Sequence, residues 1–375
     1  NVKGFDTTTW GPSVVFDNIP QDTNVYIAVH AEVYAPSWYG PGLNRYEGAW
    51  AVGYSPASTG QFTGKNWATY IIYHTPAPMS CPFLYTWNGE QYTFVSDMYG
   101  GGLLTRTPQP EDYVKIESSQ LKSKDGSYTM QIVQEYDEIS YLDRLYLTTV
   151  DHSAGVDVYP SLLRAEKEKI YTVGKNLASP ISAVDEDGKD VLQQIISKDD
   201  IYTSGRPYEL DLLVLDLGDL SDAEQIKLVL TGYTSWIPGA YPVGLPNPTA
   251  RFIEVKDVDG NWVTILKNSQ ISHPAARPRT YVLDLTGKFL TDDYSVRIGF
   301  MADVRFDYVA VDTSPQQAII VNTINPASAD LHFRGYSKVG AVPQIPDYYT
   351  FSVTPPKGYS QPSGDFTRYG DVLVI

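Results

Sequence analysis

The sequence predicts an all-β protein built from two to three β-sandwich domains, immunoglobulin-like and jelly-roll, with very little helix. Its 375 residues include 29 Tyr, 29 Gly and 26 Pro, whereas only 19% are charged, a composition typical of strands joined by tight turns. Asn-Gly and Asp-Gly pairs recur between segments of alternating apolar and polar residues, which is the pattern of β-hairpins. The length exceeds the roughly 250–300 residues at which single cores stop growing, so more than one domain is expected.

The first expected domain, residues 1–78, is an N-terminal β-sandwich. It contains two β-favouring segments, TNVYIAVHAEVYAP and NWATYIIYHT, and a loop rich in Gly and Pro between them. The proline-rich segment TPAPMSCP then indicates a linker to the next domain.

The second expected domain, residues 79–200, is β-rich and contains an aromatic hairpin, CPFLYTWNGEQYTFVSD. A two-residue Asn-Gly loop in this segment places Tyr85 opposite Tyr92 and Phe83 opposite Phe94. Such cross-strand aromatic pairs stabilise a sheet, and we predict that these rings pack on the core. The alternative is an exposed platform that binds sugar rings.

The third expected domain, residues 201–313, contains six strand-like segments: YELDLLVLDLGD, EQIKLVLTGYTSW, RFIEVKDVDGNWVTI, RTYVLDLTGKF, YSVRIGFM and FDYVAVD. Their order resembles the galactose-binding-like, or discoidin-like, jelly roll. That resemblance implies a fold only, because such jelly rolls serve as lectin modules, adhesion domains and scaffolds alike. Residues 314–375 are expected to supply C-terminal strands that pack back on the preceding domains.

A wider resemblance covers the chain from Cys81 onward. The segments CPFLYTWNGEQYTFVSD, DEISYLDRLYLTTVDHSAGVDVYP and GDFTRYGDVL resemble an uncharacterised β-domain family of secreted prokaryotic proteins. No catalytic residues can be carried over from it, because its members usually have no assigned activity. In those relatives further strands follow RYGDVL, whereas this sequence stops at Ile375, so we expect a sheet with an open edge.

Charge and cysteine content exclude several classes of function. The net charge of -16 and the pI near 4.7 argue against binding to nucleic acid or to anionic membranes, and no apolar run is long enough to span a membrane. The single cysteine, Cys81, excludes an intramolecular disulfide and a cysteine-based zinc site. A start at Asn1 rather than Met, with many Tyr, Thr and Ser, predicts an extracellular or cell-surface chain whose signal peptide has been removed.

The sequence contains no motif that predicts catalysis. It has no G-x-S-x-G, and its five histidines show neither H-x-x-x-H nor H-E-x-x-H spacing. We therefore predict that the protein is not an enzyme and needs no cofactor. Two loops resemble calcium loops but lack the glutamate at position twelve, so calcium stays an alternative to a plain hairpin turn at Asp185, Asp187 and Asp190 and at Asp257, Asp259 and Asn261.

Two hypotheses of function follow. In the first, the protein is a structural subunit of an extracellular filament or cell-surface assembly, its partners are copies of itself, and an N-terminal strand completes the sheet of the next subunit through Val2, Phe5, Thr7 and Thr9. The alternative for that segment is pairing within its own chain. In the second, the protein is a carbohydrate-binding or adhesion module that contacts glycans through loop aromatics, namely Trp38, Tyr39, Trp236 and Tyr241.

Overall fold

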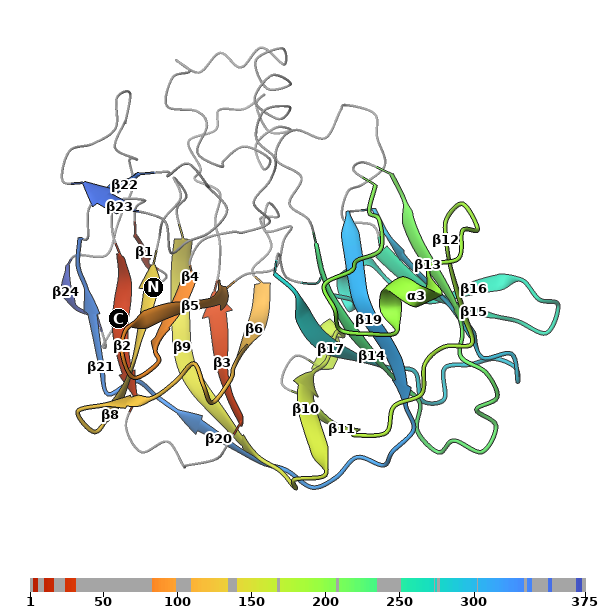
Figure 1. The fold of residues 1–375 in the computed structure, drawn as a ribbon, viewed down its shortest axis with the longest axis horizontal. Coiled ribbons are helices and arrows are strands. Elements are labelled where there is room, and N and C mark those ends of the chain that lie inside the picture. Colours follow the sequence, from red (N-terminus) through yellow and green to blue (C-terminus); the bar gives the residue numbers. More distant parts are fainter. Residues whose placement is uncertain are drawn as a thin grey trace, which may run out of the picture. The chain divides into compact units, whose positions relative to one another are not determined.

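The computed structural model describes residues 3–5, 10–16, 24–31, 83–98, 109–133, 140–166, 169–206, 209–234, 251–272, 274, 277–301, 303–333, 336–338, 350–352 and 369–372. In these ranges the chain forms antiparallel sheets, which confirms the all-β prediction (Figure 1). The helical elements described are short: α3 (Leu192–Ile195), η1 (Arg164–Glu166) and η2 (Asn268–Gln270). None of the described helices is long and apolar enough to cross a membrane.

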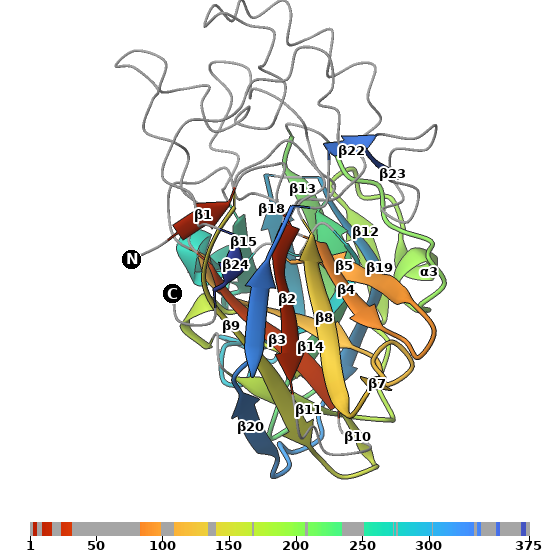
Figure 2. The ribbon, with the colours of Figure 1, turned by 90° about the vertical axis from the view of Figure 1, so that its left-hand side faces the viewer.

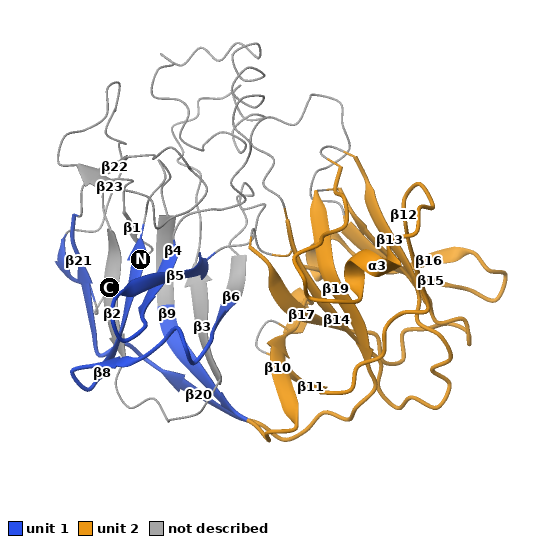
Figure 3. Ribbon diagram, viewed as in Figure 1, with its two compact units in different colours: residues 1–151, 238–241, 320–375 blue, residues 152–237, 242–319 orange. Residues whose placement is uncertain are grey.

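The chain divides into two compact units (Figure 3). Unit 1 comprises residues 1–151, 238–241 and 320–375, and unit 2 comprises residues 152–237 and 242–319. Unit 2 is therefore inserted in the sequence between β9 (Ser140–Asp151) and β20 (Ile320–Ile324), two strands of unit 1 that pair with each other.

Unit 1 contains two large sheets and one small sheet (Figure 2). In sheet I the order is β6-β3-β9, with β1 and β20 both paired to β9; in sheet II it is β24-β21-β2-β8-β4-β5, with β7 on β8. The remaining bounds in sheet I are β1 (Lys3–Phe5), β3 (Asn24–Ala31) and β6 (Gln109–Ile116). Those in sheet II are β2 (Trp10–Phe16), β4 (Phe83–Trp87), β5 (Tyr92–Asp97), β7 (Ser123–Lys124), β8 (Ser127–Val133), β21 (Ser328–Leu331) and β24 (Gly370–Asp371). A separate two-stranded sheet joins β22 (Tyr336–Lys338) to β23 (Thr350–Ser352).

Apolar side chains from both sheets meet in the core of unit 1. Leu84, Met130 and Ile132 come from sheet II, and Val114 and Leu147 come from sheet I; each is at most 1% exposed. Unit 1 is therefore a β-sandwich held by a shared apolar core.

The expected boundary between residues 1–78 and 79–200 is wrong. Strand β2 pairs with β8, and β3 pairs with β6 and β9, so strands on both sides of that boundary share the same sheets. Residues 314–375 return to the same unit, since β20 pairs with β9 and β21 pairs with β2. The local pattern predicted strands but not their distant partners, because pairing between remote segments leaves no periodic signal in either one.

Unit 2 is a second β-sandwich, and it begins earlier than the expected residue 201. In sheet III the order is β12-β13-β18-β15-β16, and in sheet IV it is β17-β14-β19. The bounds in sheet III are β12 (Ser182–Asp185), β13 (Asp211–Asp216), β15 (Arg251–Lys256), β16 (Trp262–Lys267) and β18 (Ser295–Phe300). Those in sheet IV are β14 (Lys227–Thr234), β17 (Arg279–Asp284) and β19 (Val304–Asp312). All six strand-like segments quoted for residues 201–313 contain a described strand.

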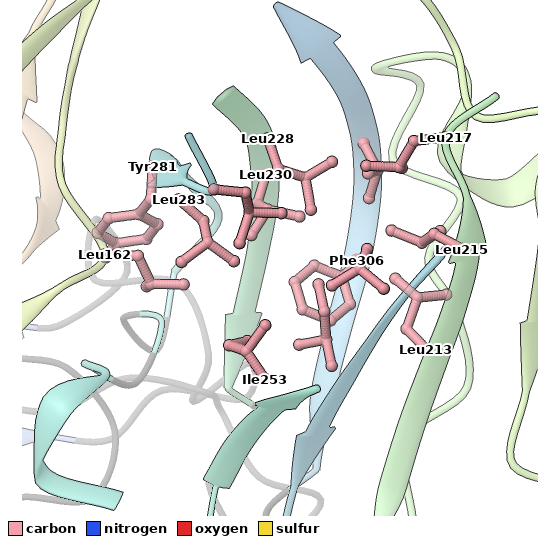
Figure 4. Close-up of a cluster of buried hydrophobic side chains, with 14 of the residues drawn as sticks. Leu162, Leu213, Leu215, Leu217, Leu228, Leu230, Ile253, Tyr281, Leu283 and Phe306 are labelled. Carbon is pink, nitrogen blue, oxygen red and sulfur yellow. The ribbon is translucent and has the colours of Figure 1, made fainter. Parts of the chain in front are cut away.

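The core of unit 2 lies between sheets III and IV (Figure 4). Leu213, Leu215 and Ile253 from sheet III face Leu228 and Phe306 from sheet IV in one buried cluster. On its other face, sheet IV is covered by the hairpin of β10 (Val156–Pro160) and β11 (Ile170–Gly174), whose Tyr171 and Val173 pack on Val229 and Val282.

A buried ion pair attaches this hairpin to sheet IV. The Lys227 ammonium lies 2.8 Å from Asp312 Oδ2 and donates to the carbonyl oxygen of Thr172 in β11 at 2.7 Å. Both charged side chains are 1% exposed. Asp312 also accepts hydrogen bonds from the backbone N–H groups of Gly174 and Ser314, so both members of the pair have further polar partners.

The turns at Asn88 and Asp257 are longer than expected, whereas one Gly-containing turn is the expected two-residue loop. Asp125-Gly126 is such a loop: both residues have positive φ, and Lys124 pairs with Ser127. In the aromatic hairpin Trp87 pairs with Tyr92, so the loop spans residues 88–91. Tyr85 therefore lies opposite Phe94 rather than Tyr92, and Phe83 lies opposite Asp97 rather than Phe94. The Asn88 carboxamide causes this difference, because its Oδ1 accepts hydrogen bonds from the backbone N–H groups of Glu90 and Gln91.

Phe83 and Tyr85 of the aromatic hairpin are buried, as predicted, but the prediction that the rings pack on the core is wrong, because they lie on the side of sheet II opposite the shared core. Phe83 is 0% and Tyr85 6% exposed, whereas Tyr92 and Phe94 are half-buried. Phe83 and Phe94 contact edge to face, with ring centroids 5.8 Å apart. Leu84, between the two aromatic positions on β4, faces the core. These rings are therefore packing residues and not an exposed sugar platform.

Candidate functional site

The N-terminal segment expected to join subunits is paired within the chain wherever it is described. Lys3 lies opposite Leu142 and Phe5 opposite Ser140 in the β1–β9 ladder. These three residues of β1 thus adopt the internal pairing that was the alternative to strand donation. Of the four proposed assembly residues, only the backbone of Phe5 is described; Val2, Thr7 and Thr9 lie outside the described residues.

Strands β1 and β20 lie along the same side of β9. Strand β3 pairs with β9 from Leu142 to Val150. It therefore occupies one long side of β9, and β1 and β20 occupy the other. Strand β20 covers β9 residues 147–151 and β1 covers residues 140–142, which leaves residues 143–146 between them. Together the two strands form this margin of sheet I.

Strand β20 is the most exposed of the strands whose burial is described in unit 1. Ile320 is 63% and Val321 47% exposed, and Asn322 and Thr323 are exposed as well. Only Ile324, the last residue, packs against the core of unit 1. The sequence analysis expected strands within residues 314–375 but did not single out this one, although the segment AIIVNTI is β-favouring and contains no charge.

The C-terminal segment supplies strand β24, which lies at the edge of sheet II. Gly370 pairs with Leu331 and Asp371 with Asp330, and among the described strands β24 has no second neighbour. The backbone N–H of Val372 donates to Ala329 at 2.9 Å and continues the pairing. The side chain of Tyr369, just before the strand, is 52% exposed.

The proposed carbohydrate contacts, Trp38, Tyr39, Trp236 and Tyr241, lie outside the described residues. The nearest described aromatic, Tyr233 near the end of β14, packs edge to face on Tyr202 with ring centroids 5.0 Å apart. The following residue, Thr234, is buried and donates its hydroxyl hydrogen to the carbonyl oxygen of Pro274. Where it is described, this end of unit 2 is packed and not a platform of exposed rings.

Three buried carboxylates, Asp211, Asp303 and Asp307, lie in or next to β13 and β19. Asp211 Oδ1 accepts the backbone N–H of Arg206 at 2.7 Å, and its Oδ2 accepts that of Val304 at 3.2 Å. Asp303 receives two hydrogen bonds from the guanidinium of Arg305, at 2.8 and 3.0 Å. Their partners are backbone groups and one arginine, so these carboxylates hold loops together.

The third carboxylate, Asp307, accepts the backbone N–H of Asp199, and Thr203 bonds with both backbone groups of Phe306. A Cβ at Gly205 would lie 1.7 Å from Asp303 Oδ1, so the close approach of this segment to β19 requires glycine. Residues 199–206 are therefore fastened to the start of β19. Sequence reasoning missed the cluster because burial alone distinguishes these aspartates from the many on the surface.

Asp211 should make the stability of unit 2 depend on pH. Burial raises the pKa of Asp211 to about 8, against which the two backbone hydrogen bonds act only in part. In the unfolded chain the same carboxyl has its ordinary pKa, near 4. Between about pH 4 and pH 8 the folded state therefore binds one proton more than the unfolded state, and the free energy of unfolding falls as the pH rises through this range.

We therefore expect Asp211→Asn to flatten the fall in stability of unit 2 between these pH values, as measured by urea unfolding across that range. Burial also raises the pKa of Asp307, which adds a residual slope that the variant keeps. An unchanged pH profile in Asp211→Asn would contradict the role given to this group.

The two loops that resemble calcium loops are hairpin turns built in the same way. Asp257 Oδ1 accepts the backbone N–H groups of Asp259 and Asn261, at 3.0 and 2.8 Å, and the bond from Asn261 is the main cause of the lowered pKa of Asp257. Asp185 Oδ1 accepts those of Asp187 and Lys189 in the same geometry. The remaining candidate ligand, Asp190, accepts the N–H of Leu192 at the start of α3. Within the described ranges, no three His, Cys, Asp or Glu side chains are grouped so that they could hold a metal ion.

Comparisons with known proteins do not assign a family. No family model matches the chain, and no curated protein matches it. A solved structure of allantoicase is similar at 12% identity and a TM-score of 0.21, covering 82% of this chain and 74% of that chain. A similarity at that level carries no argument about fold or activity.

Proposed function

We propose that this protein is a non-catalytic structural subunit of an extracellular filament or cell-surface assembly, joined to copies of itself by β-strand pairing. The observation that carries the proposal is that β1, the first described strand, has β9 as its single neighbour among the described strands and so lies at an edge of sheet I. Edge strands present unpaired backbone N–H and C=O groups, which recruit strands from other chains. The net charge of -16 is consistent with a solvated surface layer and not with a nucleic-acid partner.

Strand exchange offers a route from the internal β1–β9 pair to an assembly. The internal ladder is three residues long, and the same ladder would form between the N-terminal segment of one subunit and β9 of the next. Because an identical contact replaces the internal one, exchange costs little enthalpy, as in domain swapping. A head-to-tail contact of this kind builds a filament when its rotation does not close into a ring.

Deletion of Asn1–Thr9 tests this proposal. We expect the full-length chain to form filaments in negative-stain electron microscopy, and the deletion variant to stay folded by circular dichroism but unpolymerised. Filaments that persist after the deletion, or a full-length chain that stays unassembled at every concentration, would overturn strand donation.

The carbohydrate-binding alternative has its own test. It depends on Trp38, Tyr39, Trp236 and Tyr241, and a glycan array probes it directly. Specific glycan binding that Trp236→Ala or Trp38→Ala abolishes, without any effect on assembly, would favour an adhesion module over a structural subunit. Absence of glycan binding together with filament formation would favour the structural role.

A further inference from the structure

Strand β20 has an unusual composition for an edge strand. Among the edge strands described for sheets I to IV, it alone contains no Lys, Arg, Asp or Glu; the others are β1, β5, β6, β7, β12, β16, β17, β19 and β24. In the two-stranded sheets, β11 and the three-residue β23 are also without charge. Charge, proline and bulges are the features by which edge strands avoid pairing with other chains. The sequence of β20, IVNTI, has neither charge nor proline, and its ladder with β9 runs from Ile320 to Ile324 without a register shift.

The sequence of β20 is also complementary to itself when it runs antiparallel. With Asn322 opposite Asn322 of a second copy, Ile320 falls opposite Ile324, and Val321 falls opposite Thr323. Apolar and β-branched residues then face one another across the pair, which is the favoured arrangement. The two carboxamides at the centre can each donate to and accept from the other. A shift of two residues would instead place Ile320 opposite Asn322.

We propose that β20 pairs antiparallel with β20 of a second copy of this chain, about a two-fold axis through Asn322. The contact is isologous, because each copy contributes the same surface. It covers the exposed side chains of Ile320 and Val321, and it extends sheet I of one copy into sheet I of the other. The contact is independent of the proposed head-to-tail exchange, which uses β1 and the N-terminal segment.

The contact is small, so the dimer is concentration-dependent. A single five-residue strand per copy buries less than the roughly 1,200–2,000 Å² of a standard interface. A test must therefore trap the pair and report its register, and a symmetric disulfide does both.

Cysteine mapping provides that test, in a Cys81→Ser background because Cys81 is the one cysteine of the chain. In the proposed register, a cysteine introduced at position 322 would face its own copy with Cα atoms about 4.5–5.5 Å apart, within the disulfide range. At position 320 the two copies would stand four residues apart along the strands, roughly 13 Å, which is too far. We expect Asn322→Cys to form a disulfide dimer under mild oxidation and Ile320→Cys, its matched control on the same strand face, to remain monomeric.

A mixture of two variants checks the register independently. Val321→Cys mixed with Thr323→Cys should form a mixed disulfide, because these positions face each other across the pair. Equal cross-linking at 320 and 322, or none at 322 and none in the mixture, would overturn the proposal. Cross-linking at position 322 that persists after deletion of Asn1–Thr9 would show that the β20 contact forms independently of the proposed filament contact.

A charge at the two-fold axis gives a second measurement. Asn322→Lys would place two ammonium groups opposite each other, and we expect it to weaken the dimer at least about tenfold, equivalent to about 1.4 kcal/mol, in sedimentation velocity. Gln91→Lys adds the same charge at the exposed tip of the aromatic hairpin and serves as the control. Equal dimerisation of the two lysine variants would contradict the proposed axis.

Discussion

Replacing Lys227 by methionine is expected to lower the free energy of unfolding of unit 2 by about 3–5 kcal/mol. The substitution leaves the Asp312 carboxylate, 1% exposed, without its counter-ion and removes the donor to the carbonyl oxygen of Thr172. Removing one partner of a buried ion pair is costly because the remaining charge stays desolvated. The measurement is the urea transition of unit 2, followed separately from that of unit 1 because a two-unit chain need not unfold in one step.

The double variant Lys227→Met/Asp312→Asn distinguishes a charge effect from a packing effect. It removes both charges, while the asparagine oxygen can still accept the backbone N–H of Ser314 that Asp312 accepts at 2.9 Å. We expect the double variant to regain a large part of the stability lost in Lys227→Met, so that the two substitutions are strongly non-additive. Additive losses, or a loss below about 1 kcal/mol for Lys227→Met, would show that the pair contributes little.

Phe83→Ala is expected to destabilise unit 1 by about 3–5 kcal/mol, the range for emptying a fully buried aromatic site. Phe83 is 0% exposed and its ring contacts that of Phe94. The measurement is the urea transition of unit 1. Phe83→Leu keeps most of the side-chain volume, and we expect it to lose clearly less than Phe83→Ala.

Tyr92→Phe is the matched control within the same hairpin. Tyr92 is half-buried, and its hydroxyl donates to Thr129 Oγ1 at 2.9 Å. Loss of that single hydrogen bond should cost about 0.5–1.5 kcal/mol. If Tyr92→Phe proved as costly as Phe83→Ala, the packing role given to Phe83 would be wrong.

The all-β class and many individual strands could be predicted from local sequence. In the second half of the chain, each of the six strand-like segments contains a described strand, because alternation and β-branched residues are properties of the segment itself. The Asp125-Gly126 turn could also be predicted locally, because a two-residue hairpin loop requires positive φ at both positions and this residue pair adopts it. The prediction of a two-residue loop at Asn88-Gly89 was wrong, because the Asn88 side chain accepts backbone hydrogen bonds that stabilise a longer loop. The Asn-Gly pair by itself does not distinguish the two loop lengths.

Strand partners, by contrast, were decided by the tertiary structure. The sequence suggested a separate N-terminal sandwich, yet β2 and β3 complete sheets with strands about a hundred residues away, such as Gln131 opposite Ser13 and Leu147 opposite Ile27. Pairing between distant segments depends on which apolar faces can be buried together in one core, and no single segment encodes that. The same reason explains the candidate sites: whether Asp211 is buried, or Ile320 exposed at a sheet edge, depends on what the rest of the chain places beside it.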